Sequence, residues 1–475
     1  MNFGQNSAIL PADSKKDLGF SYGPRHYQVN NSNMPSSFNP TPQESLTGQV
    51  QIPASLVAKV RAEVQTLDQL REKLTEVEPE SVTNFLHVLL IAILTLDASD
   101  AHIEPEKEGT KIRLRIDGLL HDLIDLPKAT YEALLSRIKL VARIKLNIAD
   151  KPQDGRFSFI LGEDAMEARI ATLPAEYGEA VVLRVLNPKN LIEIGQLGLR
   201  KEVLSVLRSE LKRPNGMVVV TGPTGSGKTT TLYAFLKEIH KPEIKIITIE
   251  DPIEYHLEGI SQTQVHPEKG YDFASGLQAI VRQDPDVILV GEIRDTTTAQ
   301  IALQAALTGH LVFSTLHTND APGTISRLMS LEAKPINIGA AANVIIGQRL
   351  VRKVCAQCAT FTQASPEELA QIKKGLQGIK DAQIPSLPPT LNLARPQGCK
   401  ECNSTGYKGR IGVFEVMLVD SALEEFILTK PSTAALRKFV IKQGMTTMYQ
   451  DGLLKIVQGM TTLEELLRTT GEEKT

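Results

Sequence analysis

A glycine-rich run at residues 222–229 has the residue types and the spacing that hold a chain of phosphates. It reads Gly222-Pro223-Thr224-Gly225-Ser226-Gly227-Lys228-Thr229, and Thr230 follows it. Glycines let successive backbone N–H groups turn toward phosphate oxygens, the lysine supplies a cation, and the threonine hydroxyl suits magnesium. A buried-strand pattern precedes the run and a helical pattern follows it. We therefore expect ATP and magnesium to bind here; the alternative is a glycine-rich surface turn.

Two carboxylates follow predicted strands further along the chain. Glu250 comes directly after Ile244–Ile249, and Glu292 follows Val287–Val290. Because parallel strands end at the same edge of a sheet, both acids should face the crevice beside the phosphate loop. One can hold magnesium through water while the other activates the attacking water. Gly291 replaces the usual Walker B aspartate, so Glu292 would act alone in its segment. The alternative is that these acids are solvated and cap helices.

A third strand end carries hydroxyl groups and a histidine. His317 follows the apolar run Leu311–Phe313, together with Ser314, Thr315 and Thr318. These side chains could sense a γ-phosphate at the same edge of the sheet. His310, next to Gly309, is as well explained by capping or packing.

The cysteines indicate a metal site. All four fall in two Cys-x-x-Cys pairs, formed by Cys355, Cys358, Cys399 and Cys402. Four thiolates complete the tetrahedral shell of a structural zinc site and leave no open position for catalysis. The stretch 359–398 is longer than in common zinc ribbons, so it must loop out while its ends meet. Redox pairs or free thiols are the alternatives.

The elements that must position these residues form an α/β protein. Between 191 and 350 short apolar runs alternate with helical patterns, which predicts a mainly parallel sheet wrapped by helices. Upstream, Lys111–Ile116 alternates like a strand, and a helix is expected from Lys128 to about Leu146. We expect a disordered tail or tether at 1–55, an α/β domain at 56–190, the ATPase domain at 191–350, a zinc-binding module at 351–415 and a helical region at 416–475.

Composition indicates a soluble protein of several domains. The chain has 475 residues and a formal net charge of −3, which gives no general attraction to nucleic acid or anionic lipid. No signal peptide is visible, and the longest apolar stretch, Phe85 to Leu96, is too short to span a bilayer. We expect a cytoplasmic protein that contacts the inner face of the membrane only through partners.

Taken in order, these segments resemble the bacterial ATPases of type II secretion and type IV pilus assembly. The matching segments are the phosphate loop 222–229, the Asp box around 248–255, the atypical Walker B segment 284–295, the His box 309–320, and, upstream, 98–105, 115–118, 153–156 and 172–174. The resemblance covers about residues 80 to 460.

The resemblance implies a hexameric ring of chains, each with an N-terminal PAS-like domain and a RecA-like motor domain. Such a ring drives an inner-membrane platform protein and, through it, pilin or pseudopilin assembly. It implies that Glu250 is the water-activating base and Glu292 the acid on the magnesium side. Arginines of the N-terminal domain reach the nucleotide in this family, and Arg113, Arg115 and Arg156 are the matching candidates. Ordinary ion pairs on a strand face are the alternative for them.

The sequence departs from the family's pattern in two places, and it leaves alternative functions open. The family's longer assembly members carry a structured N-terminal docking module, whereas residues 1–50 are rich in Asn, Ser, Pro and Gly. Lys151–Gln153 also looks shorter than the family's usual run before Gln-Asp-Gly-Arg. The alternatives are a pilus-retraction ATPase, which the cysteine module disfavours, a DNA-transfer ATPase, and a nucleotide-gated scaffold that hardly hydrolyses ATP.

Overall fold

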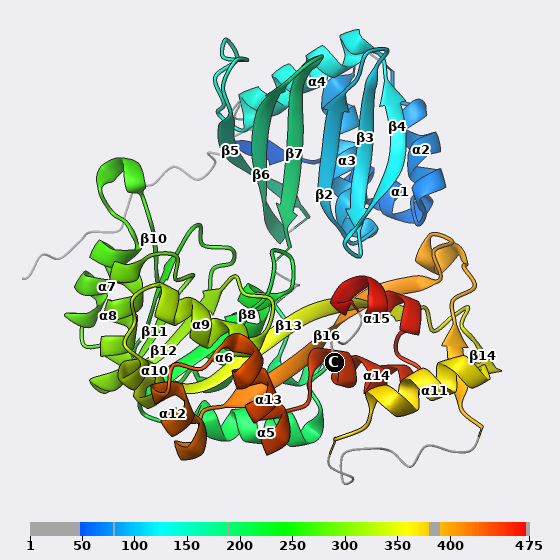
Figure 1. Ribbon diagram of the computed structural model, residues 1–475. Helices are drawn as coiled ribbons and strands as arrows, with labels where there is room; N and C mark the ends of the chain where they lie inside the picture. Colours follow the sequence, from blue (N-terminus) through cyan, green and yellow to red (C-terminus); the bar gives the residue numbers. More distant parts are fainter. Residues whose placement is uncertain (1–47, 79–80, 163, 188–190, 380–389, 472–475) are drawn as a thin grey trace, which may run out of the picture. The chain divides into compact units, whose positions relative to one another are not determined.

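The computed structural model describes residues 48–78, 81–162, 164–187, 191–379 and 390–471 (Figure 1). The disordered tail expected at 1–55 lies outside the described residues as far as position 47. From there the expectation is wrong, because Gln49–Gln51 form a strand paired with β5 and a helix begins at Ala54. Residues 49–186 and 191–471 each build a sheet of their own, and each is described by itself below.

The N-terminal sheet has seven strands among the described residues. In spatial order they are β1 (Gln49–Gln51), β5 (Gln153–Leu161), β6 (Asp164–Ala175), β7 (Gly178–Leu186), β2 (Ala98–Pro105), β3 (Thr110–Ile116) and β4 (Leu119–Leu126). Every neighbouring pair is antiparallel except β1 and β5. The strand predicted at Lys111–Ile116 is therefore confirmed as part of β3. The turn after β3 places Asp117 and Gly118 at positive φ, as the sequence pattern Asp-Gly indicates.

Four helices accompany this sheet, namely α1 (Ala54–Glu63), α2 (Leu67–Thr75), α3 (Val82–Thr95) and α4 (Lys128–Val141). The apolar stretch at 85–96 forms α3, whose residues Phe85 to Ile93 are all buried, and α3 packs against β2, β7 and the other three helices. No helix among the described residues has the length and apolarity needed to cross a bilayer. Helix α4 ends at Val141, five residues before the predicted end, because Arg143 turns to positive φ.

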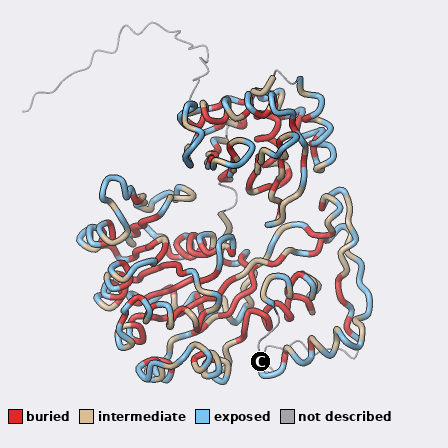
Figure 2. The backbone as a smooth tube through the Cα atoms, turned by 45° about the horizontal axis from the view of Figure 1, so that its top comes forward, coloured by how far each residue is buried: buried red, intermediate tan, exposed pale blue. Residues whose placement is uncertain are grey.

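The second sheet also has seven described strands, and it carries the chemistry-bearing segments. In spatial order they are β10 (Ser261–Gln264), β9 (Ile246–Glu250), β11 (Val287–Val290), β12 (Leu311–Leu316), β8 (Gly216–Thr221), β13 (Ala342–Val354) and β16 (Tyr407–Leu418). All pairs are parallel except β13 with β16. The predicted parallel sheet is confirmed, and its strands β8, β9, β11 and β12 are buried along their whole length, whereas β10 is not. Figure 2 colours the backbone by this burial.

Helices cover both faces of this sheet, because successive side chains of a strand point to opposite faces. Val218 and Val220 of β8 pack with α5 (Lys201–Glu210) and α6 (Lys228–Ile239). Met217 and Val219 pack on the other face, in a core shared with several helices. These are α7 (Phe273–Val281), α8 (Thr296–Leu307), α9 (Ala321–Ser330), α10 (Pro335–Ala341), α12 (Ser421–Leu428) and α13 (Thr433–Gln443).

The remaining elements form the cysteine module and the chain's last two helices. The module holds β14 (Thr360–Gln363), α11 (Pro366–Gly375) and β15 (Asn392–Arg395). The two helices are α14 (Met448–Val457) and α15 (Leu463–Thr470), which come after α13 in the chain. The expected boundaries at 350 and 415 fall inside β13 and β16, which are paired along most of their length. The second sheet therefore continues into the stretch expected to form the zinc-binding module.

Candidate nucleotide site and metal centre

The phosphate loop joins the buried strand β8 to helix α6, as its sequence predicts. Gly222, Gly225 and Gly227 all have positive φ, at 155°, 78° and 87°. A Cβ on Gly222 would lie 2.5 Å from the carbonyl oxygen of Gln348, and one on Gly227 would lie 2.9 Å from the Gln348 amide nitrogen. The loop therefore needs glycine both for its backbone angles and for its close approach to β13.

Polar groups converge on this loop. Lys228, the first residue of α6, donates from Nζ to the carbonyl oxygens of Gly222 and Pro223, at 2.9 and 3.1 Å. The Ser226 hydroxyl is buried and has no hydrogen-bond partner among the described residues. A buried hydroxyl without a partner is costly, and a phosphate oxygen would satisfy it. Thr229 is exposed beside them, so the residues present fit a magnesium-bound nucleoside triphosphate.

Glu292 lies between the side chains of Arg294 and His317 at the end of β11. Its carboxylate is 2.6 Å from Arg294 and 3.1 Å from Nε2 of His317, and the residue is 9 % exposed. Burial lowers the pKa of Lys228, while the charge of Glu292 acts in the opposite direction and that of Arg349 adds to the lowering. The structure thus brings Glu292 and His317 into contact, with Glu292 close enough to Lys228 for their charges to interact, as the strand-end argument requires.

Gly291 explains why this segment lacks the usual aspartate. A Cβ at this position would lie 3.2 Å from the carbonyl oxygen of Ile249 and 3.3 Å from Cα of Glu250. Strand β9 approaches too closely for a larger side chain to fit without a shift. The acid is instead carried one residue later, by Glu292.

The carboxylate of Glu250 is buried and held by three donors. Thr248 Oγ1 donates at 2.6 Å, Gln262 Nε2 at 3.1 Å, and the hydroxyl of Tyr233 also donates. Burial raises the pKa of Glu250, and these three hydrogen bonds act against the rise. The donors come from α6, β9 and β10, so Glu250 ties the phosphate-loop helix to the Asp box. Glu254, in the same box, is only partly buried.

The His box joins the phosphate-loop strand to helix α9. The hydroxyl of Thr221, the last residue of β8, accepts from the backbone N–H of Thr318 at 2.9 Å. It is also hydrogen-bonded to the Thr318 hydroxyl, at 2.6 Å. His310 contacts the carbonyl oxygen of Ala305 at the end of α8, at 3.0 Å. That contact agrees with the capping alternative for His310, whereas His317 lies at the acidic cluster.

The three candidate arginines have different surroundings within the N-terminal domain. Arg113 forms an ion pair with Glu104, and Arg115 lies 3.4 Å from Asp100 and 3.2 Å from His102. Arg156, on β5, is exposed. The first two match the alternative of strand-face ion pairs, and a role for any of the three at a nucleotide stays a prediction.

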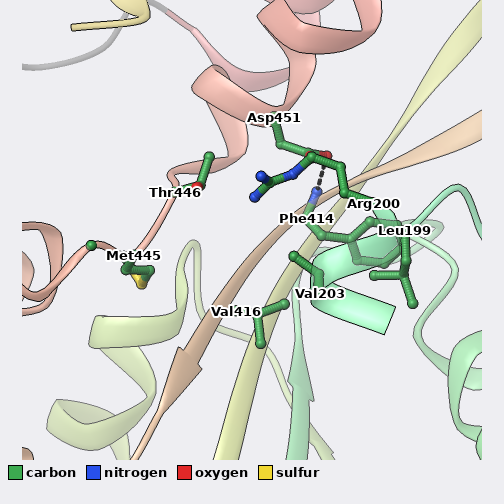
Figure 3. A pocket seen from close by; sticks show the side chains of 9 residues that line it. Leu199, Arg200, Val203, Phe414, Val416, Met445, Thr446 and Asp451 are labelled. Atoms are coloured by element: carbon green, nitrogen blue, oxygen red, sulfur yellow. Dashed lines mark hydrogen bonds and ion pairs between the residues drawn. The ribbon is translucent and has the colours of Figure 1, made fainter. Parts of the chain in front are cut away.

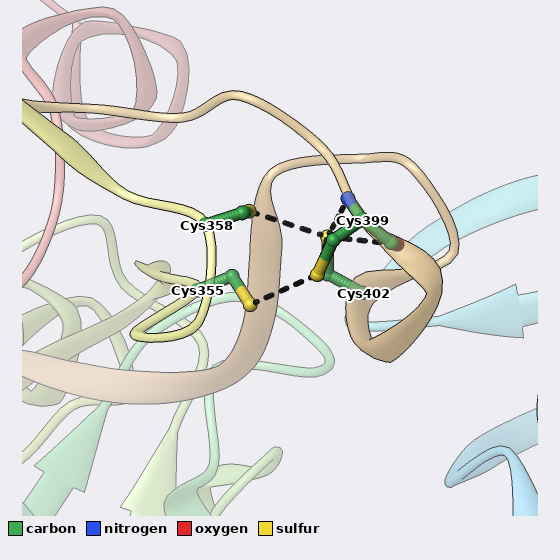
Figure 4. A group of neighbouring side chains, drawn as sticks. All are labelled: Cys355, Cys358, Cys399 and Cys402. Atoms are coloured by element: carbon green, nitrogen blue, oxygen red, sulfur yellow. Dashed lines mark hydrogen bonds between the residues drawn. The ribbon is translucent and has the colours of Figure 1, made fainter.

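The four cysteines form one cluster, although 40 residues separate the two pairs (Figure 4). Their sulfurs lie within 4.8 Å of one another, with 3.9 Å between Cys355 and Cys399, 3.8 Å between Cys358 and Cys402, and 3.7 Å between Cys399 and Cys402. Backbone N–H groups of Cys399 and Gly406 each point at the Cys402 sulfur, at 3.2 Å. The intervening stretch loops out as predicted, through β14, α11 and β15.

Comparison with known proteins identifies the family. A family model described as "Type II/IV secretion system protein" matches residues 75–468. The chain belongs to this family. Type II secretion system protein E of Aeromonas hydrophila is 41% identical over 412 residues, 86% of this chain and 79% of that one. Type IV pilus assembly ATPase PilB of Thermus thermophilus is 42% identical over 421 residues, 88% of this chain and 46% of that one.

Solved structures agree with this family. The pilus retraction motor PilT with bound ADP is 28% identical, has a TM-score of 0.54, and matches 81% of this chain and 96% of its own. The Legionella pneumophila ATPase DotB is 21% identical, with a TM-score of 0.58 and coverage of 81% and 94%, and supports the fold. The predicted family, the α/β fold class and the assignment as an ATPase are confirmed.

Several residues at the site were missed by sequence reasoning. Arg294 has a local signal, because it follows Glu292 by two residues at the same strand end. Tyr233, Gln262, Gln348 and Arg349 have none, since each reaches the site from another element. Gln348, for example, accepts a hydrogen bond from Thr231 of α6 at 2.8 Å. Only the fold places them beside the phosphate loop.

Proposed function

We propose that this ATPase works as a homohexameric motor that powers pilin or pseudopilin assembly, in type IV pilus biogenesis or type II secretion, by acting on an inner-membrane platform protein. The placement of Glu292 carries the proposal for the chemistry. It lies between Arg294 and His317 at the edge where parallel strands end, close enough to Lys228 for the two charges to interact. A carboxylate in this place can hold magnesium, and the cations near it can stabilise the negative charge that develops on a transferring phosphoryl group.

Each part of the site has a role in the proposed reaction. Backbone N–H groups of Gly222 and of residues 224–229, with the Lys228 side chain and the Ser226 hydroxyl, would bind the triphosphate. Thr230 lies in the first turn of α6, directly after the loop. Thr229 and Glu292 would hold magnesium, which supplies Lewis-acid stabilisation of the phosphoryl oxygens when bound. His317 orients the Glu292 carboxylate. Arg115 and Arg156, with Arg113 at the nucleotide, are proposed to contribute from a neighbouring domain or subunit.

The cysteine cluster supports an assembly motor over a retraction motor. We propose that it binds one structural zinc ion, since four sulfurs at these separations match a tetrahedral thiolate shell. The relatives named above that are 41% and 42% identical to this chain over the aligned residues are a secretion protein and a pilus assembly ATPase. The proposed motor acts at the cytoplasmic face of the inner membrane through its partners and requires no nucleic acid.

The first test of the proposed chemistry is a pair of substitutions in the full chain. Lys228→Ala should abolish tight binding of a fluorescent ATP analogue as well as turnover, because the phosphates lose their main cation. Glu292→Gln should leave binding largely intact and lower kcat by about a hundredfold or more, in the range of a lost acid–base or metal-side carboxylate. Lys241→Ala and Glu258→Gln change exposed residues of the same domain and serve as matched controls.

The same assay separates the two carboxylates of the Asp box. Glu250 is the predicted base, yet three donors already hold its oxygens. If Glu250→Gln leaves kcat within a few-fold of wild type and Glu254→Gln does not, then Glu250 positions the Asp box and Glu254 acts on the water. Turnover near the wild-type level in both Lys228→Ala and Glu292→Gln would refute the site as a whole.

A further inference from the structure

Glu415 is a buried acid that the proposed chemistry does not use. It lies on β16, opposite Gly347 of β13, and only 1 % of its surface is exposed. Burial raises its pKa to about 6, while the N–H of Ala321 and the charge of Arg437 act in the opposite direction. A carboxylate in such a place is costly unless its oxygens have specific partners.

The partners of Glu415 are the first backbone N–H groups of two helices. Oε1 accepts from Ala321, the first residue of α9, at 2.6 Å, and Oε2 accepts from Met448, the first residue of α14, at 3.4 Å. These groups have no partner within their own helices. Each helix also has its own cap, since Asp320 binds the N–H of Gly323 and Thr447 binds that of Gln450. The single carboxylate therefore joins two separately capped helices.

Gly347 provides the space for this contact. A Cβ at Gly347 would lie 2.8 Å from Cγ of Glu415, 3.0 Å from its Oε1 and 3.2 Å from the nitrogen of Ala321. The φ of Gly347 is not in the left-handed region, so glycine is needed here for room and not for its backbone angles. Because Gly347 has no side chain, the Glu415 carboxylate can cross β13 at this position and reach α9.

The two helices lead to different parts of the molecule. Helix α9 begins four residues after His317, and the intervening loop is bonded to Thr221 beside the phosphate loop. Helix α14 packs through Tyr449 and Leu453 against Ile372 of α11 and Leu393 of β15, the elements between the two cysteine pairs. Glu415 thus stands between the nucleotide site and the cysteine module.

We propose that Glu415 is a positioning residue of this ATPase that couples the His box to helix α14, so that a change at the nucleotide site moves the cysteine-bearing module. The proposal rests on the proposed ATP-driven function and specifies how one chain transmits it. A carboxylate suits the role because both of its oxygens accept hydrogen bonds. Glutamine of nearly the same size offers one accepting oxygen, and its NH₂ group would face the other backbone N–H.

The charges around Glu415 support a mechanical role and not a catalytic one. Asp320 forms an ion pair with Arg437 of α13, and Arg349 donates to the carbonyl oxygen of Asn319 at 2.9 Å. All three surround the start of α9, and both Asp320 and Arg437 shift the pKa of Glu415. The start of α9 is therefore held by groups from β13, β16 and α13, and Glu415 alone among them also binds α14.

A substitution at Glu415 should leave α14 in place, because a second clamp holds it on β16. The carboxylate of Asp451 accepts from the N–H of Phe414 and from Nε of Arg200, both at 3.0 Å (Figure 3). It also binds Lys455 of its own helix. The Glu415→Gln variant can therefore fold and still lose the link between α9 and α14.

The test uses the full chain and hydrogen–deuterium exchange with and without a non-hydrolysable ATP analogue. In the wild type, the analogue should change exchange in both 317–330 and 448–457. In Glu415→Gln the analogue should bind with a Kd within about threefold of wild type and should still change exchange at 317–330, but not at 448–457. Its kcat should fall roughly tenfold, or about 1.4 kcal/mol. Glu425→Gln, an exposed acid on α12, is the matched control.

A second variant guards against a folding defect. Gly347→Ala places a methyl group in the path of the carboxylate and should give the same loss of the α14 response while Glu415 itself is unchanged. The inference is overturned if the wild type shows no response at 448–457, or if either variant keeps that response, even with a lowered melting temperature or kcat. If the wild type binds the analogue and responds but hydrolyses no ATP, the proposed function fails while the coupling stands.

Discussion

Loss of one cysteine should remove a metal ion and unfold the cysteine module while the nucleotide site keeps its affinity. Three of the sulfur pairs are 3.7 to 3.9 Å apart. A regular tetrahedron with edges of about 3.8 Å has its centre about 2.3 Å from each corner, which is the zinc–thiolate distance. The perturbation is Cys402→Ser, because this buried sulfur also receives the N–H groups of Cys399 and Gly406.

The expected size of the effect follows from how little else orders the stretches that carry the cysteines. The buried apolar cluster beside them consists of Val354, Ala394 and Tyr407, whereas α11 and β15 pack with α14 in a separate core. Burial of a large apolar side chain contributes about 1.5–3 kcal/mol, whereas ordering ten residues of backbone costs about 10–20 kcal/mol. Structural zinc in small peptides supplies about 10–16 kcal/mol. The metal is therefore the main source of order around the cysteines, and its loss should unfold this region.

The assay combines metal analysis with hydrogen–deuterium exchange on protein purified without added zinc. We expect about one zinc ion per wild-type chain and almost none in Cys402→Ser, since four thiolates fill one shell. Exchange should rise sharply at 355–363 and 399–407, and binding of the ATP analogue should stay within a few-fold of wild type. Gln357→Ser, an exposed position between Cys355 and Cys358, is the matched control.

Two results would refute this reasoning. One is a wild-type protein without metal, whose four thiols react with an alkylating agent while the backbone of the module stays protected. The other is a Cys402→Ser variant that loses nucleotide affinity as fully as Lys228→Ala. The first would show that packing alone orders the module, and the second that the module and the phosphate loop are one folding unit.

Two further predictions concern the arginines and the C-terminal helix. Arg115→Ala and Arg156→Ala should lower kcat far more than nucleotide affinity, with Arg61→Ala as an exposed control. Light scattering of the wild type with the ATP analogue should report a hexamer. Monomers at all concentrations, together with unchanged turnover in both variants, would contradict the proposal. Burial would raise the pKa of Glu465, but hydrogen bonds from Arg468 and Arg352 hold it at about 2. Ionised Glu465 thus stabilises the fold above pH 4.5, and this contribution is lost as the pH falls toward 2. Glu465→Gln should therefore lower the free energy of unfolding at pH 7 by about 2 kcal/mol, after allowance for solvent screening. In chemical denaturation the difference from the wild type should shrink below pH 4.5.

The sequence predicts those parts of the site that depend on local spacing or on the ends of parallel strands. The phosphate loop is local, because its glycines, Lys228 and Ser226 lie within seven residues. Glu292 and His317 are 25 residues apart and still meet, since β11 and β12 are parallel neighbours that end at the same edge. Pattern and topology are sufficient for such contacts.

Contacts that depend on tertiary packing leave no such pattern. Nothing around Glu250 in the sequence shows that Tyr233 and Gln262 hold its carboxylate, because they come from a helix and from the edge strand. Glu415 is 94 residues from Ala321, and nothing in the sequence of β16 shows which groups its carboxylate binds. The domain boundary expected at 350 fails to mark any break for the same reason, since β13 continues to Val354 and pairs with a strand that begins at Tyr407.

Helix α14 gives the zinc and Glu415 substitutions different consequences, although both should weaken the motor's output. The backbone N–H of its first residue, Met448, donates to Glu415, and Tyr449 and Leu453 pack against α11 and β15 of the cysteine module. Cys402→Ser removes order from the module but leaves the link from the His box to α14, so nucleotide should still change exchange at 448–457. Glu415→Gln leaves the module folded and its zinc bound but removes that response. Cys402→Ser would then interrupt the coupling between α14 and the module, and Glu415→Gln the coupling between the His box and α14. Together the two variants would order the steps from nucleotide to module within one chain.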